Sequence, residues 1–260
     1  MADLVLTEMR ENGALVTLNR PETRNALSGK EMVDALLAAL DVIRTEGRAR
    51  VIVLTGAGTA FSSGGDLNQM RATNERAGRE PWALIDHFRH GIQRIPTFLA
   101  EFPLPIIAAV NGPAIGAGCD LACMCEIRIA ARSARFAESF VKLGIISADG
   151  GSWLLPRIIG KSKAYELALT GDPLDAEGAL ACGLVSKVVD DDRLLDEAFA
   201  IAARIARNPP FAVQMTKLLM REAESGSIGS ALKLSAALQA LAHTTPEHRA
   251  ALEKAPGRKS

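Results

Sequence analysis

The stretch NGPAIGAGCDLA, residues 111–122, follows the apolar run PIIAAV at 105–110 and decides how this chain folds. A continuous apolar run that ends at glycine is typical of a strand buried on both faces. The small residues after it let a ligand approach backbone N–H groups closely, and a helix that begins there adds the positive end of its dipole. The stretch therefore predicts a buried strand, a glycine-rich loop and a helix N-terminus suited to a negatively charged oxygen.

A second segment has the same layout: RVIVLTG at 50–56 is followed by AGTAFSSGGDL at 57–67. Neither segment ends in the Gly-Lys-Ser/Thr of a P-loop, and neither matches the dinucleotide fingerprint. Two such loops side by side could aim two backbone N–H groups at one oxygen atom, which is the arrangement of an oxyanion hole. The residues alone leave a simpler interpretation open, two tight strand-to-helix turns without a ligand.

Further strands and helices are expected on both sides of these loops. Asn12–Gly13 is a hairpin turn signal, while Ser28 and Glu31 have the spacing of a helix capping box with Gly47 as the stop. After Pro209 the apolar period is helical, which indicates a C-terminal helical region of about 50 residues. The other strand candidates are LVLTEM (4–9), ALVTLN (14–19), EIRIAA (126–131) and LVSKVV (184–189).

The composition argues against several classes of partner. The 260 residues carry 30 Lys+Arg and 30 Asp+Glu, so no net positive charge attracts nucleic acid or an anionic membrane. The four cysteines lack the spacing of zinc ligands and are expected as free thiols, mostly buried. No basic leader and no apolar run of about 20 residues is visible, so we expect a cytoplasmic protein without a membrane segment.

Four segments occur in an order and spacing that resemble one known family. They are LNRPETRNALS (18–28), FSSGGDL (61–67), NGPAIGAGCDLA (111–122) and LTGDPLDAEGALACGLVSKVV (169–189). Together they are similar to the crotonase superfamily, the enoyl-CoA hydratase/isomerase family, from Leu4 to about Leu252. The resemblance implies an α/β fold with a spiral of β-β-α repeats over 1–207. It also implies a helical region, 208–260, that assembles homotrimers or hexamers made of two trimers.

The resemblance also implies a substrate and the residues around it. Family members bind acyl-CoA thioesters and need no metal or redox cofactor. Two backbone N–H groups hold the thioester carbonyl, and by position these belong to Gly65 and Ala117. Asp66 is expected chiefly as the cap of the following helix, and Arg24 either contacts a CoA phosphate or is an ordinary surface arginine. The full implied substrate-binding set is Arg24, Ala26, Ser63, Gly64, Asp66, Leu67, Gly116 and Phe140.

The acid and the base are the open question. Hydratases of the family use two glutamates, whereas this chain has Asp120 at the first position and Phe140 at the second. Asp149 is the other catalytic candidate, because branches such as the dienoyl-CoA isomerases carry a working aspartate close to this position. The alternatives are that Asp120 only complements the helix dipole and that Asp149 only caps the next helix. Glu138 is expected to take no direct part.

These residues predict an acyl-CoA-transforming enzyme of the enoyl-CoA hydratase/isomerase type. Loss of the second glutamate favours isomerisation, or a specialised reaction such as dienoyl-CoA or ring isomerisation, because moving a double bond needs only one shuttling base. Hydration through Asp149 stays open. The alternatives from other classes are a catalytically weak acyl-CoA-binding homologue and an RNA-binding member of the family, and the neutral charge argues against the second.

Overall fold

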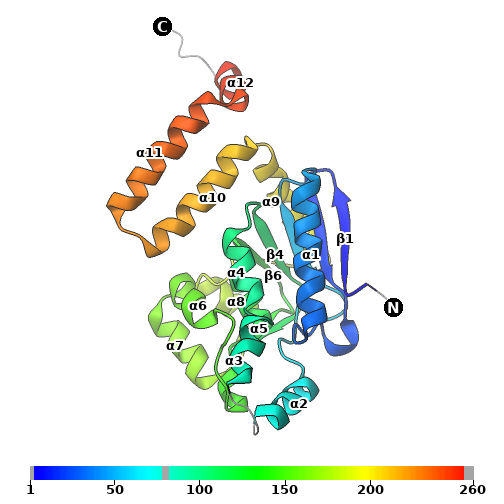
Figure 1. The fold of residues 1–260 in the computed structure, drawn as a ribbon. Helices are drawn as coiled ribbons and strands as arrows, with labels where there is room; N and C mark the ends of the chain where they lie inside the picture. Colours follow the sequence, from blue (N-terminus) through cyan, green and yellow to red (C-terminus); the bar gives the residue numbers. More distant parts are fainter. Residues whose placement is uncertain (1–2, 78–81, 255–260) are drawn as a thin grey trace.

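The computed structural model describes residues 3–77 and 82–254, and Figure 1 shows their arrangement. A six-stranded sheet in the order β1-β2-β3-β4-β6-β9 runs through the core. The β1–β2 hairpin is antiparallel and every other pair in this sheet is parallel. The strands are β1 (Val5–Arg10), β2 (Gly13–Leu18), β3 (Ile52–Gly56), β4 (Ile106–Val110), β6 (Ile127–Ala131) and β9 (Lys187–Val189).

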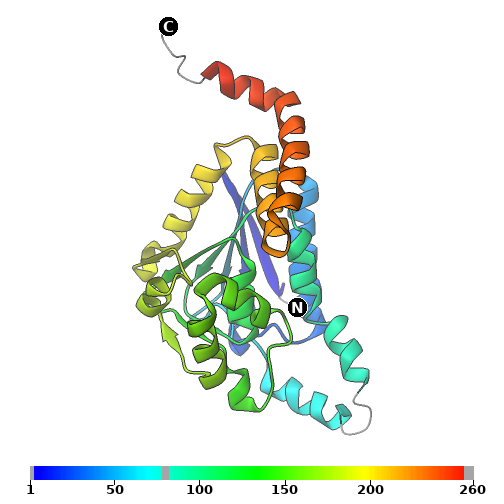
Figure 2. The same ribbon diagram turned by 90° about the vertical axis from the view of Figure 1, so that its left-hand side faces the viewer.

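The central strands are apolar without interruption because both faces of the sheet are covered. Every residue of β3 and of β4 is buried. Their side chains alternate between two cores, so that Leu54 packs towards α1 (Lys30–Glu46) and Val53 packs towards α9 (Leu194–Ala206). Figure 2 shows these two helices on opposite sides of the strands. The predicted buried strands are therefore confirmed.

A second, smaller sheet lies beside the first and carries the glycine-rich loop. It consists of β5 (Pro113–Ile115), β7 (Arg135–Ala137) and β8 (Leu174–Asp175), with β5 and β7 parallel. Helix α5 (Ala117–Met124) begins two residues after β5 ends. A strand, a glycine turn and a helix thus follow one another as the opening stretch of sequence predicts.

The remaining helices of the core surround this second sheet. Figure 1 places α2, α3, α6 and α7 at the end of the molecule away from the C-terminus. Their bounds are α2 (Leu67–Ala77), α3 (Ala83–Arg89), α4 (Arg94–Glu101), α6 (Gly151–Ile159), α7 (Lys161–Thr170) and α8 (Ala176–Ala181). The described residues also form three 3₁₀ turns, η1 (Pro21–Thr23) before α1, η2 (Ser139–Leu143) before α6 and η3 (Asp191–Arg193) before α9.

The C-terminal region is helical, as the sequence period predicts. It consists of α10 (Pro210–Ser225), α11 (Ile228–Thr244) and α12 (Pro246–Lys254). Helix α11 folds back along α10 and, with α12, stands out from the core (Figures 1 and 2). Neither α11 nor α12 has a buried residue, and their exposed large apolar side chains are Ile228, Leu232, Leu241 and Leu252.

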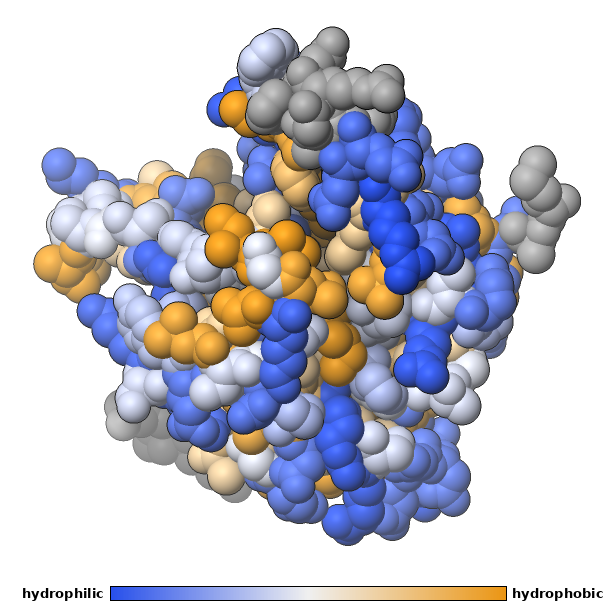
Figure 3. Space-filling view, turned by 90° about the horizontal axis from the view of Figure 1, so that it is seen from below, coloured by the Kyte–Doolittle hydropathy of each residue, from blue (hydrophilic) through white to orange (hydrophobic). Residues whose placement is uncertain are grey.

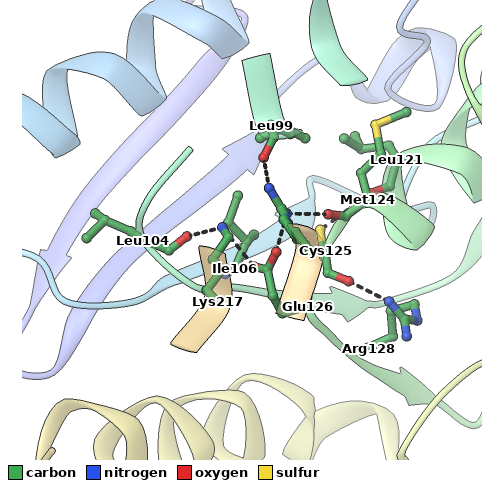
Figure 4. Close-up of polar contacts among 10 residues, drawn as sticks. Leu99, Leu104, Ile106, Leu121, Met124, Cys125, Glu126, Arg128 and Lys217 are labelled. Atoms are coloured by element: carbon green, nitrogen blue, oxygen red, sulfur yellow. Dashed lines mark hydrogen bonds and ion pairs between the residues drawn. The ribbon is translucent and has the colours of Figure 1, made fainter. Parts of the chain in front are cut away.

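Ion pairs that we call the Glu126 cluster (Glu126, Lys217 and Arg221) fasten α10 to the core, as Figure 4 shows. Lys217 Nζ lies 3.1 Å from Glu126 Oε2 and donates to the Leu104 carbonyl at 2.6 Å. Arg221 pairs with the other Glu126 oxygen and donates to the Leu99 carbonyl. Burial lowers the pKa of Lys217 to about 8, although the neighbouring Glu126 opposes that shift.

Several local expectations from the sequence are confirmed by the structure, and one is wrong. The first hairpin is confirmed, and Gly47 ends α1 in the left-handed conformation at φ 67°. The capping box of Ser28 and Glu31 is wrong: Gly29 is the N-cap of α1, and the Ser28 hydroxyl accepts from the Asp66 N–H at 2.6 Å. The four cysteines are free, three of them buried. Within the described residues, no helix is long and apolar enough to span a bilayer.

Candidate active site

The two glycine-rich loops meet at the N-terminus of α5. Ser62 pairs with Ala114, and the Ile115 N–H donates to the Ser62 carbonyl at 2.9 Å. Glycine is required for this approach: a Cβ on Gly64, which has φ +76°, would lie 2.3 Å from the Ile115 oxygen and 3.0 Å from the Ala117 nitrogen. The structure therefore brings Gly64, Gly65 and Ala117 together, as the two matching segments predict.

The backbone amides of Gly65 and Ala117 have no acceptor within the described part of the chain, and neither do the next two amides of α5, those of Gly118 and Cys119. The amides that precede them are both bonded: Gly64 N–H donates to Ser62 Oγ at 3.1 Å, and Gly116 N–H donates to the Ala137 carbonyl at 2.7 Å. The loops are thus held by the neighbours of the two amides, while the two amides remain able to bind an oxygen. Ala117 also stands at the N-terminus of α5, where the helix dipole favours negative charge.

The loop that carries Arg24 packs against the first glycine loop. Arg24 is exposed with φ 54°, and its carbonyl accepts from the Ser63 N–H at 2.8 Å. The next residue, Asn25, is buried, with φ 58°, and its amide donates to two carbonyls of the first loop, at 2.9 and 2.8 Å. Ala26 is buried directly after it. Asn25 is a site residue that sequence reasoning missed, although asparagine is one of the few non-glycine residues that tolerate this backbone region.

The other residues implied by the resemblance border the same junction. Asp66 caps α2, because its Oδ1 accepts from the N–H groups of Asn68 and Gln69 at 2.7 and 3.1 Å, so its expected role is confirmed. Leu67 is more than half exposed. The ring of Phe140 lies over Gly116, where a Cβ would be 3.4 Å from the ring, and so covers the start of the second loop.

Three carboxyl groups that we call the acid cluster, those of Asp120, Glu138 and Asp149, are buried next to this junction. Their exposed fractions are 0%, 3% and 3%. Each keeps one oxygen without a hydrogen-bond partner among the described residues, Asp120 Oδ1, Glu138 Oε1 and Asp149 Oδ2. Glu138, for which the sequence predicts no direct part in catalysis, is buried beside the two aspartates.

The hydroxyl of Ser147 bridges the two aspartates. Ser147 Oγ lies 2.9 Å from Asp120 Oδ2 and 3.4 Å from Asp149 Oδ1. The same oxygen accepts from the Gly151 N–H at 3.1 Å, at the start of α6. Gly150 is the N-cap of that helix and no side chain caps it there. The alternative that Asp149 caps α6 is therefore wrong, and Ser147 supplies the hydroxyl that sequence reasoning overlooked.

The environment separates the proton affinities of the two aspartates. Burial raises the pKa of Asp120 well above its usual range, and the charges of Glu138 and Asp149 raise it further. Burial also raises the pKa of Asp149, but hydrogen bonds from Asp120, Ser147 and the backbone oppose that rise. Asp120 therefore holds a proton more tightly, and its O–H can donate to the carboxylate beside it. A pair with separated pKa values can supply one acid and one base.

Gly151 has no side chain and so leaves room for the Asp120 carboxyl. A Cβ on Gly151 would lie 1.8 Å from Asp120 Oδ1 and 2.5 Å from its Cγ. No lysine, arginine or histidine of the described residues forms an ion pair with any of the three carboxyls. The described residues also hold no group of three or more His, Cys, Asp or Glu arranged to bind a metal ion. Burial raises the pKa of Asp120 and of Asp149, which suits proton transfer near neutral pH.

Comparison with known proteins places this chain in a family. The family described as "Enoyl-CoA hydratase/isomerase" matches residues 8–254 of this chain. The chain belongs to the enoyl-CoA hydratase/isomerase family. It is 37% identical over 249 residues to the 1,2-epoxyphenylacetyl-CoA isomerase of Escherichia coli K12, covering 96% of this chain and 94% of that protein. It is 35% identical over 232 residues to the 2,3-dehydroadipyl-CoA hydratase of the same strain, covering 89% and 87%.

A solved structure confirms the crotonase-type fold. The crystal structure of an enoyl-CoA hydratase/isomerase from Cupriavidus metallidurans CH34 superimposes with a TM-score of 0.89 at 30% identity, covering 96% of this chain and 92% of that one. The family includes both hydratases and isomerases among the relatives similar to this chain. Family membership therefore supports acyl-CoA chemistry, and the residues of the site have to decide the reaction.

The face of the molecule that carries α3 and the segment between β7 and α6 exposes apolar side chains. Figure 3, seen from below, shows apolar residues gathered in the middle of this face with hydrophilic residues around them. Exposed apolar side chains of the segment between β7 and α6 are Val141, Leu143, Ile145 and Ile146, and Ile85 and Phe88 are exposed on α3. An exposed apolar area rimmed by polar residues is typical of a binding surface.

Proposed function

We propose that this chain is an enoyl-CoA isomerase that moves a double bond along an acyl-CoA thioester. The observation that carries the proposal is that two buried aspartates, each with one oxygen that lacks a hydrogen-bond partner among the described residues, lie near the junction where the Gly65 and Ala117 amides have no acceptor. Asp120 stands three residues after Ala117, in the first turn of α5, so its carboxyl belongs to the same helix end as the Ala117 amide.

The first step forms a dienolate. The N–H groups of Gly65 and Ala117 donate to the thioester oxygen as negative charge develops on it. Asp149, the aspartate with the lower proton affinity, accepts the proton from C2 of a 3-enoyl thioester. Removing one donor of an oxyanion hole typically lowers the rate about 100- to 1,000-fold, so the two amides account for a large part of the expected rate acceleration.

The second step returns a proton further along the chain. Protonated Asp120 gives its proton to C4, and the double bond then lies between C2 and C3. Asp149 returns its proton to Asp120 through the Ser147 hydroxyl, which contacts both carboxyls. No proton is gained or lost overall and no electron leaves the substrate, so the proposal needs no cofactor, and CoA arrives as part of the substrate.

Isomerisation is favoured over hydration because of Phe140. Hydration requires a second group to activate water, and the family position for that glutamate carries the Phe140 ring, which lies over Gly116. An apolar ring excludes water from this side of the site. Exposed Arg24 is proposed to contact a CoA phosphate, since the guanidinium geometry matches phosphate oxygens.

The C-terminal region is proposed to assemble homotrimers, or hexamers made of two trimers. Helices α11 and α12 expose apolar side chains and have no buried residue within the described chain, so an isolated chain leaves this surface uncovered. Light scattering of the purified protein is expected to give three or six times the mass of the 260-residue chain. A monomer at micromolar concentration contradicts this assignment.

The test of the proposed reaction uses deuterated water. When a 3-enoyl-CoA is incubated with the protein, we expect trans-2-enoyl-CoA that carries deuterium from the solvent. Mass spectrometry measures the incorporated deuterium. Formation of a 3-hydroxyacyl-CoA from the trans-2-enoyl-CoA assigns hydration instead. If the thioester binds but is neither converted nor labelled with deuterium, the proposed enzyme activity is wrong and the chain is an acyl-CoA-binding protein.

A further inference from the structure

Glu138 is a buried carboxyl with no structural task in the fold. It directly follows Ala137 of β7, whose carbonyl accepts the Gly116 N–H of the second glycine loop at 2.7 Å. Glu138 is the N-cap residue of η2, yet its side chain caps no N–H there. It is 3% exposed, and its Oε1 has no hydrogen-bond partner among the described residues.

The groups that face Glu138 are acidic or neutral. Helix α5 presents the Cys119 thiol and the Asp120 carboxyl to it, with Cys123 behind Cys119, and the segment before α6 presents Asp149. No basic side chain of the described residues pairs with it. A carboxyl buried among like charges lowers the stability of a fold. Its presence therefore needs an explanation other than stability.

We propose that Glu138 is a positioning residue of the acid cluster: its charge keeps the cluster's proton on Asp120 and leaves Asp149 free to accept one. This inference rests on the proposed function, because it assigns the acid and base roles to particular aspartates. Glu138 itself does not touch the substrate in this account and acts through Asp120.

The physical cause is electrostatic. After burial, the charge of Glu138 is the largest influence that raises the pKa of Asp120. Burial raises the pKa of Glu138 as well, but hydrogen bonds from Asp120 and from the Cys119 thiol oppose that rise and favour its ionised form. A glutamine of the same shape removes the charge. Asp120 then holds its proton less tightly, and the acid and base lose their separation.

The experiment measures the protonation of Asp120 without a substrate. Infrared spectra of the ligand-free protein are recorded against pH, and the band of a protonated carboxyl is assigned by its loss in Asp120→Asn. In Glu138→Gln the midpoint at which this band disappears is expected to fall by about one pH unit or more, a tenfold loss of proton affinity. Glu11→Gln, in the exposed first hairpin turn, is the matched control and leaves the midpoint unchanged.

Kinetics supply the second readout. If protonated Asp120 is the acid, activity is lost as pH rises through its pKa, so the alkaline limb of the rate profile shifts downward in Glu138→Gln by the same amount. Glu138→Asp keeps the charge and is expected to restore most of the wild-type profile. An unchanged infrared midpoint in folded Glu138→Gln overturns the inference, whereas an inactive wild type overturns the proposed function alone.

Folding defects are covered by a second substitution. Glu138→Met removes the charge with a side chain of similar length that needs no hydrogen bond. The infrared midpoint is expected to fall in this variant as in Glu138→Gln. If both variants lose cooperative unfolding, Glu138 is required for the fold and the positioning role is wrong.

Discussion

Two clusters of buried or half-buried ionisable side chains stand out in the described part of the chain, and they differ in the charges that they bring together. In the Glu126 cluster, one carboxylate faces two cations, and Lys217 Nζ is 3.1 Å from it. In the acid cluster, three carboxyls face one another, and each keeps an oxygen without a partner among the described residues. The cluster of opposite charges fastens a helix, and the cluster of like charges is the candidate for chemistry.

The surroundings of the two clusters support this division. Glu126 Oε2 also accepts the Ile106 N–H at 2.8 Å, so the first cluster ties α10 to β4 through backbone and side chain together (Figure 4). The acid cluster has no cation among the described residues: Asp149 caps no helix, and the aspartates are hydrogen-bonded to the start of α6 through the Ser147 hydroxyl. Burial of unpaired carboxyls costs stability, and functional sites are where such costs are retained.

The largest expected effect is on catalysis, from Asp149→Asn. Losing a positioned acid or base typically lowers a rate by about 100- to 10,000-fold, and isomerisation of a 3-enoyl-CoA is the measurement. Asp192→Asn, an exposed aspartate of η3, is the matched control with an unchanged rate. A rate within threefold of wild type for Asp149→Asn would show that another group removes the C2 proton.

The next effect is on stability, from Glu126→Ala. This change leaves buried Lys217 and half-buried Arg221 without their carboxylate, so we expect the unfolding free energy to fall by at most the cost of breaking a buried ion pair, about 3–5 kcal/mol. Urea unfolding is the measurement, with exposed Glu11→Ala as the control that changes it by less than about 0.5 kcal/mol. If Glu126→Ala unfolds as wild type does, α10 is held by packing alone.

A third effect follows from the space beside Asp120. The Cβ of Gly151→Ala would lie 1.8 Å from Asp120 Oδ1, so the carboxyl must move. We expect a loss of about 1–3 kcal/mol from overpacking and about 100-fold in rate, because displacing a reacting group by about 1 Å is enough for that. Gly229→Ala on α11, where a Cβ has its nearest neighbour at 3.7 Å, is the control and retains full activity. If Gly151→Ala has the kinetics of wild type, Asp120 takes no part in the reaction.

The smallest effects are opposite pH dependences of the two clusters. The pKa of Lys217 is about 8 in the folded chain against 10.5 normally, so the unfolded chain holds more protons between these values. The stability of wild type relative to Lys217→Met therefore rises with pH across this window, by at most about 1.4 kcal/mol per pH unit.

The raised pKa of Asp120 changes stability with pH in the opposite direction. The stability of wild type relative to Asp120→Asn falls as pH rises above about 3.9. Unfolding curves at several pH values test both signs, and two slopes of the same sign contradict the comparison.

The sequence predicts the fold and the two loops because those features are local. Apolar runs bounded by glycine place β3 and β4, and the small residues at 64–65 and 116–118 are recognisable where they stand. The cap formed by Asp66 is equally local and is confirmed. The capping box at Ser28 fails because its hydroxyl meets a residue 38 positions away, which no short pattern contains.

The acid cluster is only partly visible in the sequence for the same reason. Asp120 and Asp149 stand near positions where the family carries working acids, so position alone identifies them as candidates. Glu138 stands two residues from the expected position, and only the pairing of β5 with β7 brings it to the start of α5. Ser147 is a small polar residue without a motif, and its bridge between Asp120 and Asp149 depends on three segments meeting.

The central claim is that the acid cluster is kept for chemistry at a cost in stability, and Asp120→Asn tests it in one preparation. Isomerisation and urea unfolding are measured on the same protein at pH 7. We expect the rate to fall by about 100-fold or more while the unfolding free energy equals or exceeds that of wild type. A variant that turns over at nearly the wild-type rate but loses about 1 kcal/mol or more of stability would contradict the claim, because Asp120 would then hold the fold together and not act on a substrate.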